Sequence, residues 1–131
     1  FKAVKNFLYT MIETLDSGET YYVIGARYEE KIFGVRPFFK DFHLKRSKKK
    51  VKLKMLANHE TKGNIEQETF KLGTVRFLPD YLLTNMHIFL FRENTFMVLW
   101  SKNPIAFHIK NADVTKSFST YFNAFWKTAK K

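Results

Sequence analysis

The chain has 131 residues, 45% hydrophobic and 18% aromatic, a composition that excludes a disordered chain and suffices for one domain with a buried core. Cysteine is absent, which excludes disulfides and thiolate metal sites, and no apolar run approaches the roughly 20 residues of a membrane span. The formal net charge of +11 favours an anionic partner such as nucleic acid, and we expect a cytoplasmic protein with no membrane partner.

The first half of the chain predicts two helices and two strands. Apolar residues recur at helical spacing over residues 1–16 and predict an amphipathic helix that ends near Gly18. The apolar run 21–26 predicts a buried strand, and Pro37 suits the first turn of a second helix. Residues 51–56 alternate apolar and basic side chains, which predicts a strand whose lysine-bearing face is open to water.

The second half predicts a polar loop, further strands and a last helix. Residues 57–67 are polar, with a short helix expected around residues 66–72 and a strand at 74–78 that stops at Pro79. Two strands, 86–91 and 95–100, are expected to form a hairpin, followed by a strand at 105–109. Asp113 is the expected N-cap of a final helix with an aromatic stripe.

This order of elements predicts a single domain, residues 1–131, of the α/β (α+β) class. A helix between the first two strands favours a parallel pair, and the later hairpins add antiparallel partners. We therefore expect a mixed β-sheet flanked by helices on both faces. The chain begins at Phe1 rather than Met, so we expect it to belong to a longer protein.

The hairpin, residues 85–103, resembles the one that carries the H-x-K-x(4)-D motif of phospholipase D-type phosphodiesterases. His87 is present, but Phe89 stands at the lysine position and Asn94 at the aspartate position. The resemblance implies that an active member uses the histidine as nucleophile, the lysine to bind phosphoryl oxygens and the aspartate to orient the histidine. Since Phe89 and Asn94 cannot do this, we expect no catalytic residue and no enzyme.

The whole succession of segments resembles the phospholipase D-like central domain of archaeal TrmB-type transcriptional regulators. The segments that carry this resemblance are residues 17–27, 51–56, 75–79, 104–109 and 118–126. It implies a homodimer whose DNA-binding helix-turn-helix lies outside this chain, with residues 1–16 as a linker or coiled-coil helix from that missing domain. The function expected from it is dimerisation and sensing of an effector. A divergent dimeric phosphodiesterase or nuclease and a basic nucleic-acid-binding module stay open as alternatives.

An effector pocket is expected where strand ends converge. Arg27 suits a small anionic effector because its planar guanidinium can grip a carboxylate or phosphate, although a surface salt bridge would also explain it. His87 is open to two interpretations, a hydrogen-bonded core histidine or a ligand contact. The full predicted set is Arg27, Asn58, His59, His87, Ser101 and Asn103.

A basic cluster is expected to contact nucleic acid, with a merely solvated charged surface as the alternative. The residues of this cluster are Lys45, Arg46, Lys48, Lys49 and Lys50. The four histidines show no metal-binding spacing, and glycine-rich phosphate loops are absent from the sequence. No metal and no cofactor are therefore expected.

Overall fold

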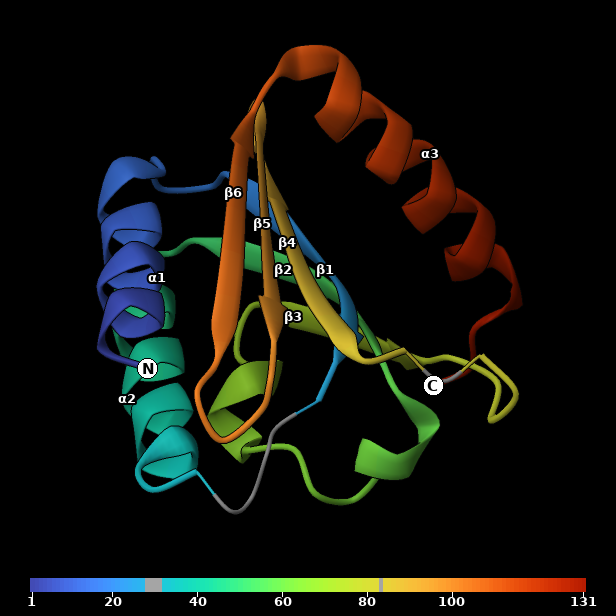
Figure 1. Ribbon diagram of the computed structural model, residues 1–131, viewed down its shortest axis with the longest axis horizontal. Helices are drawn as coiled ribbons and strands as arrows, with labels where there is room; N and C mark the ends of the chain where they lie inside the picture. The colour runs from blue at the N-terminus through green and yellow to red at the C-terminus, as the bar shows by residue number, and fades with distance from the viewer. Residues whose placement is uncertain (28–31, 83) are drawn as a thin grey trace.

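A computed structural model describes residues 1–27, 32–82 and 84–131 (Figure 1). In these residues a six-stranded sheet lies between helices on its two faces, as the sequence predicts. The elements in chain order are α1 (Lys2–Thr14), β1 (Thr20–Ala26), α2 (Val35–Lys48), β2 (Lys52–Ala57), η1 (His59–Thr61), η2 (Gln67–Phe70), β3 (Gly73–Phe77), β4 (Met86–Phe91), β5 (Asn94–Leu99), β6 (Ile105–Lys110) and α3 (Ala112–Thr128).

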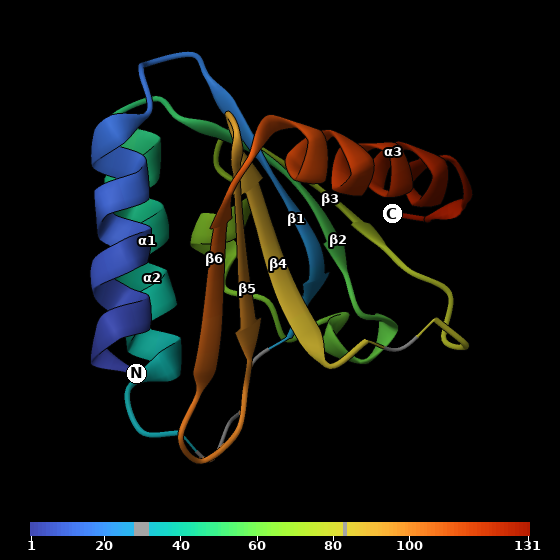
Figure 2. The ribbon, with the colours of Figure 1, turned by 45° about the horizontal axis from the view of Figure 1, so that its top comes forward.

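The sheet has two halves of opposite character, in the strand order β3-β2-β1-β4-β5-β6. β1, β2 and β3 are parallel, while β4, β5 and β6 are antiparallel neighbours joined by hairpins, with β4 against β1. The mixed sheet and the α/β (α+β) class are thereby confirmed. Figures 1 and 2 show α1 and α2 side by side on one face and α3 crossing the other.

The larger core lies between the sheet and the pair α1 and α2. In α1, Val4, Leu8 and Met11 follow helical spacing and are buried. Burial of each such side chain contributes about 1.5–3 kcal/mol. In β1, Tyr21 and Val23 point to the same core, because alternate residues of a strand share a face. The apolar stripe of α1 is thus part of this core.

The smaller core lies under α3, where Phe122 is buried against Ile24, Leu56 and Leu90. The N-cap of α3 differs from the prediction. Asn111 caps the helix, since its Oδ1 accepts the backbone N–H groups of residues 113 and 114, and Asp113 lies in the first turn.

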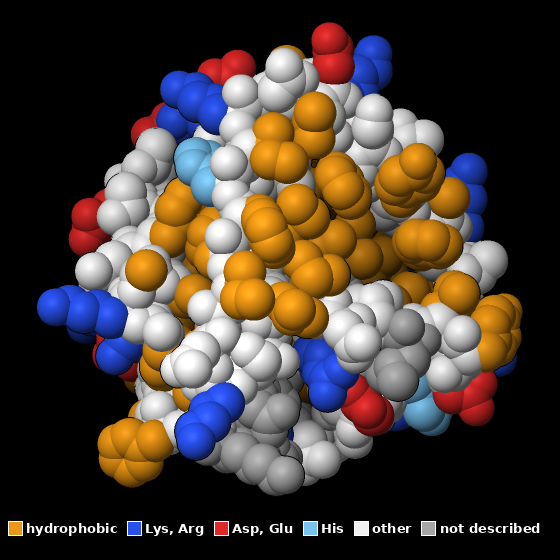
Figure 3. Space-filling model, in the orientation of Figure 1, with side chains coloured by type: hydrophobic (Ala, Val, Ile, Leu, Met, Phe, Trp, Pro, Cys, Tyr) orange, Lys and Arg blue, Asp and Glu red, His pale blue; other side chains and the backbone are white. Residues whose placement is uncertain are grey.

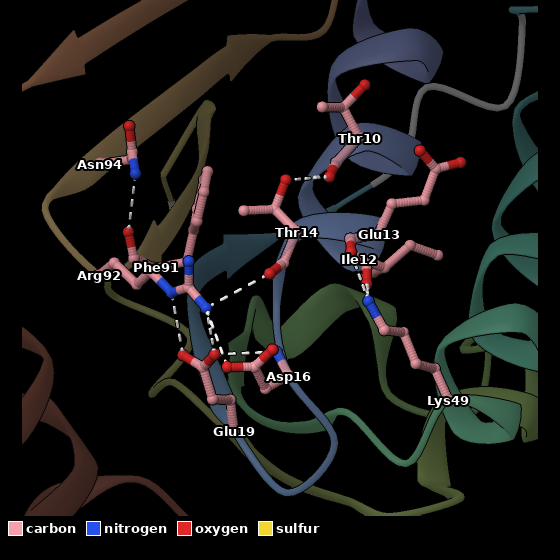
Figure 4. A network of polar contacts seen from close by, with 10 residues as sticks. All are labelled: Thr10, Ile12, Glu13, Thr14, Asp16, Glu19, Lys49, Phe91, Arg92 and Asn94. Atoms are coloured by element: carbon pink, nitrogen blue, oxygen red, sulfur yellow. Dashed lines mark hydrogen bonds and ion pairs between the residues drawn. The ribbon is translucent and has the colours of Figure 1, made fainter.

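A polar network joins the β4–β5 turn to the end of α1 (Figure 4). Arg92, at φ +52° in the turn, pairs with Glu19 and Asp16. Lys49 Nζ donates to the carbonyl of Ile12 at 3.0 Å and to that of Glu13. These carbonyls belong to the last turn of α1, whose acceptors lack partners within the helix. The network therefore fixes the end of α1 against the start of the sheet.

Candidate functional site

His87 lies on β4 in an aromatic cluster and is fully buried. Trp100 Nε1 donates to its Nδ1 at 3.1 Å, and the Phe89 ring stacks on it at a centroid distance of 4.4 Å. Burial lowers the pKa of His87 to about 3, so the ring is neutral at physiological pH. Of the two predicted interpretations, this geometry is that of a hydrogen-bonded core histidine, without access to a ligand in solvent.

Arg27 and Asn58 lie close to the segment that precedes β4. Arg27 donates to Asn85 Oδ1 at 2.7 Å and lies 3.7 Å from a Glu60 oxygen. Asn58 is buried and donates to the carbonyl of Thr84 at 2.8 Å. Both residues therefore stabilise the connection between the parallel and antiparallel halves of the sheet, and Arg27 makes the surface salt bridge that was the alternative to ligand binding.

His59, a member of the predicted set, lines a cavity. This cavity of about 440 Å³ lies beyond the carboxyl ends of β2 and β3. Its wall also includes Lys62, Lys130, Asp80 and Tyr81, which the sequence patterns did not single out. The other predicted residues are not in its wall. Ser101 and Asn103 contact each other in the β5–β6 turn, where Ser101 Oγ donates to the carbonyl of Asn103 at 2.8 Å.

The basic cluster divides into exposed lysines and one buried arginine. Lys45, Lys48, Lys49 and Lys50 are exposed at the end of α2. Arg46 is fully buried, and burial lowers the pKa of its guanidinium. It therefore cannot contact nucleic acid, which corrects the prediction for this residue.

Arg46 instead fixes the segment before β3. Its guanidinium donates to the carbonyls of Val51 at 2.8 Å, Thr69 at 3.1 Å and Lys71 at 2.7 Å, and Nε donates to His43 Nδ1 at 3.1 Å. Arginine suits this position because its fork presents several donors in fixed directions. This role could not be predicted from the sequence, because an arginine within a run of lysines is expected to be exposed to solvent like its neighbours.

A basic groove lies where α2 ends and the parallel strands begin. It has a volume of about 310 Å³ and is lined by Thr20, Lys52, Leu53, Lys54, Phe70, Leu72, Gly73 and Thr74. Lys52 and Lys54 are both exposed, as the alternation in β2 predicted. Residues two apart on a strand project from the same face about 6.6 Å apart. The groove therefore presents two neighbouring positive charges beside threonine hydroxyls.

An apolar face covers the antiparallel half of the sheet beside α3. Figure 3 shows hydrophobic side chains in a continuous band across this part of the molecule. Cross-strand register places Ile88, Met97 and Phe107 in one row and Leu99 and Ile105 in the next. Ile105 and Phe107 are 50% and 49% exposed, and Tyr121 of α3 is 56% exposed. A contiguous apolar surface of this kind is typical of an interaction site.

β6 also forms an edge of the sheet, since it pairs only with β5 among the described strands. Its outer backbone groups can therefore accept a further strand. The apolar face and this edge adjoin each other, so one partner could cover both.

Comparisons with known proteins find similarity at the level of solved structures. No protein-family model matches the chain, and no curated protein matches it. Its fold is similar to that of TrmBL2. TrmBL2 is described as an archaeal chromatin protein whose structure shows a novel mode of DNA binding. The TM-score is 0.60 at 18% sequence identity, and the match covers 98% of this chain but 51% of the TrmBL2 chain. This chain thus spans about half of the length of that protein.

Within the described residues, no helix has the length and apolar character needed to cross a membrane. The same residues contain no group of three or more histidine, aspartate or glutamate side chains arranged to hold a metal ion.

Proposed function

We propose that this chain is a non-catalytic dimerisation domain of a cytoplasmic TrmB-like archaeal regulator or chromatin protein. Its DNA-binding helix-turn-helix would lie outside this chain. The main support for the proposal is the exposed apolar face of β4, β5 and β6, which a second copy of the chain would cover. The similarity to TrmBL2, which binds DNA, supports a DNA-associated role for the parent protein.

Charge favours contact through this face. Two copies that each carry +11 repel one another over most of their surface, so association requires a contact with few basic side chains. The rows that contain Phe107 and Ile105 consist of uncharged residues. A dimer built on them would keep the lysine-rich regions of the two copies apart.

The size and symmetry of the surface also suit a second copy. A free aromatic side chain offers roughly 150–250 Å² of surface, so half-exposed Phe107 and Tyr121 leave about 100 Å² each. With the surrounding aliphatic residues they supply the centre of an interface of about 800 Å² per partner. A two-fold axis beside β6 would pair like strands antiparallel, which generates a closed dimer.

The absence of catalysis is supported by the hairpin. Phe89 is buried beside His87 where a phosphodiesterase would need a cation, and Asn94 Oδ1 lies 2.9 Å from His108 Nε2 on the neighbouring strand. Phe89 offers no charge to a phosphoryl group, and the neutral amide of Asn94 replaces the carboxylate that would orient a catalytic histidine. Hydrolysis of a generic phosphodiester by the purified chain, abolished in His87→Ala, would overturn this part of the proposal and favour a divergent phosphodiesterase.

Effector sensing has a candidate location in the cavity that His59 lines. Lys62 and Lys130 bring positive charge to its wall, while Phe77 and Leu78 supply apolar surface. This combination suits a small anion with an apolar portion. Inorganic phosphate and benzoate can be tested as probes by thermal shift. An increase in melting temperature that is lost in Lys62→Gln would support sensing at this location, and no shift with either probe would oppose it.

The test of dimerisation is the molar mass of the 131-residue chain, measured by light scattering after size exclusion at several concentrations. We expect twice the chain mass for the unmodified protein and the monomer mass for Phe107→Glu, since the new carboxylate would be buried without a partner. Circular dichroism would check that the variant is folded.

The matched control is Ala106→Glu, the preceding residue of β6. It is also exposed and introduces the same charge, but it points to the opposite face of the sheet. We expect this control to remain dimeric. A monomeric unmodified chain, or equal dissociation by the two variants, would contradict self-association through the apolar face.

A further inference from the structure

The basic groove combines charge, hydroxyls and a fixed wall in one place. Lys52 and Lys54 project from β2, and register places Thr20 beside Lys52 and Thr74 beside Lys54. The carbonyl and amide groups of β2 pair with those of β1 and β3 on either side, so β2 offers its side chains to a ligand. Ammonium and hydroxyl groups are donors, and together they suit the oxygens of a polyanion.

The surroundings of the groove extend its positive charge. Lys48 and Lys50 are exposed at the end of α2, immediately before β2, and Lys71 is exposed immediately before β3. The acidic residue next to Thr20 is Glu19, which is paired with Arg92. The surface around the groove is consequently a strip of lysines along the amino ends of β2 and β3.

Buried Arg46 gives the groove a rigid wall. By binding the carbonyls of Thr69 and Lys71 it fixes the segment that carries Phe70 and Leu72, both of which line the groove. Phe70 is 44% exposed although its neighbour Thr69 is fully buried. An ordered wall lowers the entropy lost when a ligand is bound. The arginine thus positions the groove without contacting its ligand.

We propose that this groove and its lysine strip bind the sugar-phosphate backbone of duplex DNA, in addition to any separate DNA-binding domain. Exposed lysines neutralise phosphates and release counterions, a contact that is independent of base sequence. Phe70 and Leu72 offer apolar contact to the sugars. A single-stranded ligand would require several exposed rings in succession, whereas one aromatic ring lines this groove.

The groove and the apolar face can be occupied at the same time. The groove lies at β2 and β3, and the apolar face lies at β4, β5 and β6, on the far side of β1 in the strand order. A dimer would therefore carry two grooves on its outer parts. The proposal does not rest on dimerisation, and the two are tested by separate measurements.

The test uses the complete 131-residue chain and a fluorescently labelled duplex of mixed sequence, with binding followed by anisotropy over a range of salt concentrations. The variant combines Lys50→Gln, Lys52→Gln and Lys54→Gln. We expect its affinity to fall about tenfold or more at low salt. The slope of log affinity against log salt should become shallower by roughly 0.9 for each lost phosphate contact, about 2.7 in all.

The matched control removes the same charge from the opposite end of the molecule by combining Lys2→Gln, Lys40→Gln and Lys102→Gln. These lysines are exposed at the start of α1, in the first part of α2 and in the β5–β6 turn, at the end away from the groove (Figure 1). We expect a small loss of affinity and a nearly unchanged salt slope.

Three results would overturn the proposal. The first is the absence of measurable duplex binding by the unmodified chain. The second is an equal loss of affinity in the groove and control variants, which would indicate diffuse attraction by net charge. The third is tighter binding of the single strand than of the duplex. The Phe107→Glu variant separates this proposal from dimerisation, because it should lose the dimer mass while each chain keeps its groove and its salt slope per site.

Discussion

Replacing Arg46 should test both the stability of the fold and the order of the groove wall. Arg46→Met replaces the aliphatic part of the arginine with an unbranched apolar side chain and removes every donor of the guanidinium. The carbonyls of Val51, Thr69 and Lys71 and Nδ1 of His43 would lose their donor, at present 2.7–3.1 Å away.

The expected cost follows from these four acceptors. Each buried acceptor left without a donor costs about 1–3 kcal/mol, so a simple sum is roughly 4–12 kcal/mol. The sum is too high, because residues 68–72 can move outward and let water reach some of the carbonyls. Removal of one partner from a buried charged network typically costs about 3–5 kcal/mol, and we expect a loss of unfolding free energy in that range.

The assay is urea denaturation followed by circular dichroism, together with hydrogen exchange of residues 68–74. We expect a lower midpoint with a similar m-value, and faster exchange in that segment. Lys45→Met is the control, because Lys45 precedes Arg46 on α2 but is exposed, and it should change stability by less than about 0.5 kcal/mol. A loss below about 1 kcal/mol for Arg46→Met, with unchanged exchange, would refute the positioning role.

Two further predictions concern pH and backbone strain. Burial lowers the pKa of His87 to about 3 and that of His43 well below its usual range, while the unfolded chain protonates near pH 6.5. The contribution of these neutral histidines to the unfolding free energy should therefore be complete above about pH 6.5, and below it should fall by up to ~1.4 kcal/mol per histidine per pH unit. Urea midpoints measured from pH 7 to 5 check this. A constant midpoint would contradict it. Gly25 has φ +74°, and a Cβ there would lie 2.5 Å from the Met86 carbonyl oxygen, so Gly25→Ala should cost about 2–4 kcal/mol in the same assay. Gly18→Ala, at φ +91° but in open space, should cost only about 1 kcal/mol, and equal costs would show that the close approach is unimportant.

Periodicity along the chain was enough to predict most elements. The spacing of Val4, Leu8 and Met11 and the alternation in β2 are properties of neighbouring residues, and local geometry converts them directly into a helix and a strand. The helix between β1 and β2 likewise indicated the parallel pair, because parallel strands need a long crossover. The sequence predicted Asp113 as the N-cap of α3, but the cap is Asn111, two residues earlier. The prediction was wrong because asparagine and aspartate are both good N-cap residues.

The histidine on β4 shows where local pattern stops being sufficient. The sequence indicated that a catalytic lysine and aspartate are missing around His87, but it left open whether the ring faces a ligand or the core. Trp100, 13 positions later, decides this by donating to Nδ1 inside the aromatic cluster. Such a contact depends on the register between β4 and β5 and on the covering helix α2. A short sequence motif predicts neither of these.

The sequence by itself determined the elements of this protein, its charge and the lack of a phosphodiesterase motif. Only the tertiary structure decided which charges and apolar residues are free to bind. Arg46 is buried, and its guanidinium binds the carbonyls of Thr69 and Lys71, more than 20 positions later in the chain. Lys52 and Lys54, by contrast, are exposed at the groove. Phe107 resembles a core residue in sequence, but α3 crosses elsewhere and leaves it uncovered. Exposure depends on which elements meet in space, and that is a property of the packed fold rather than of local sequence.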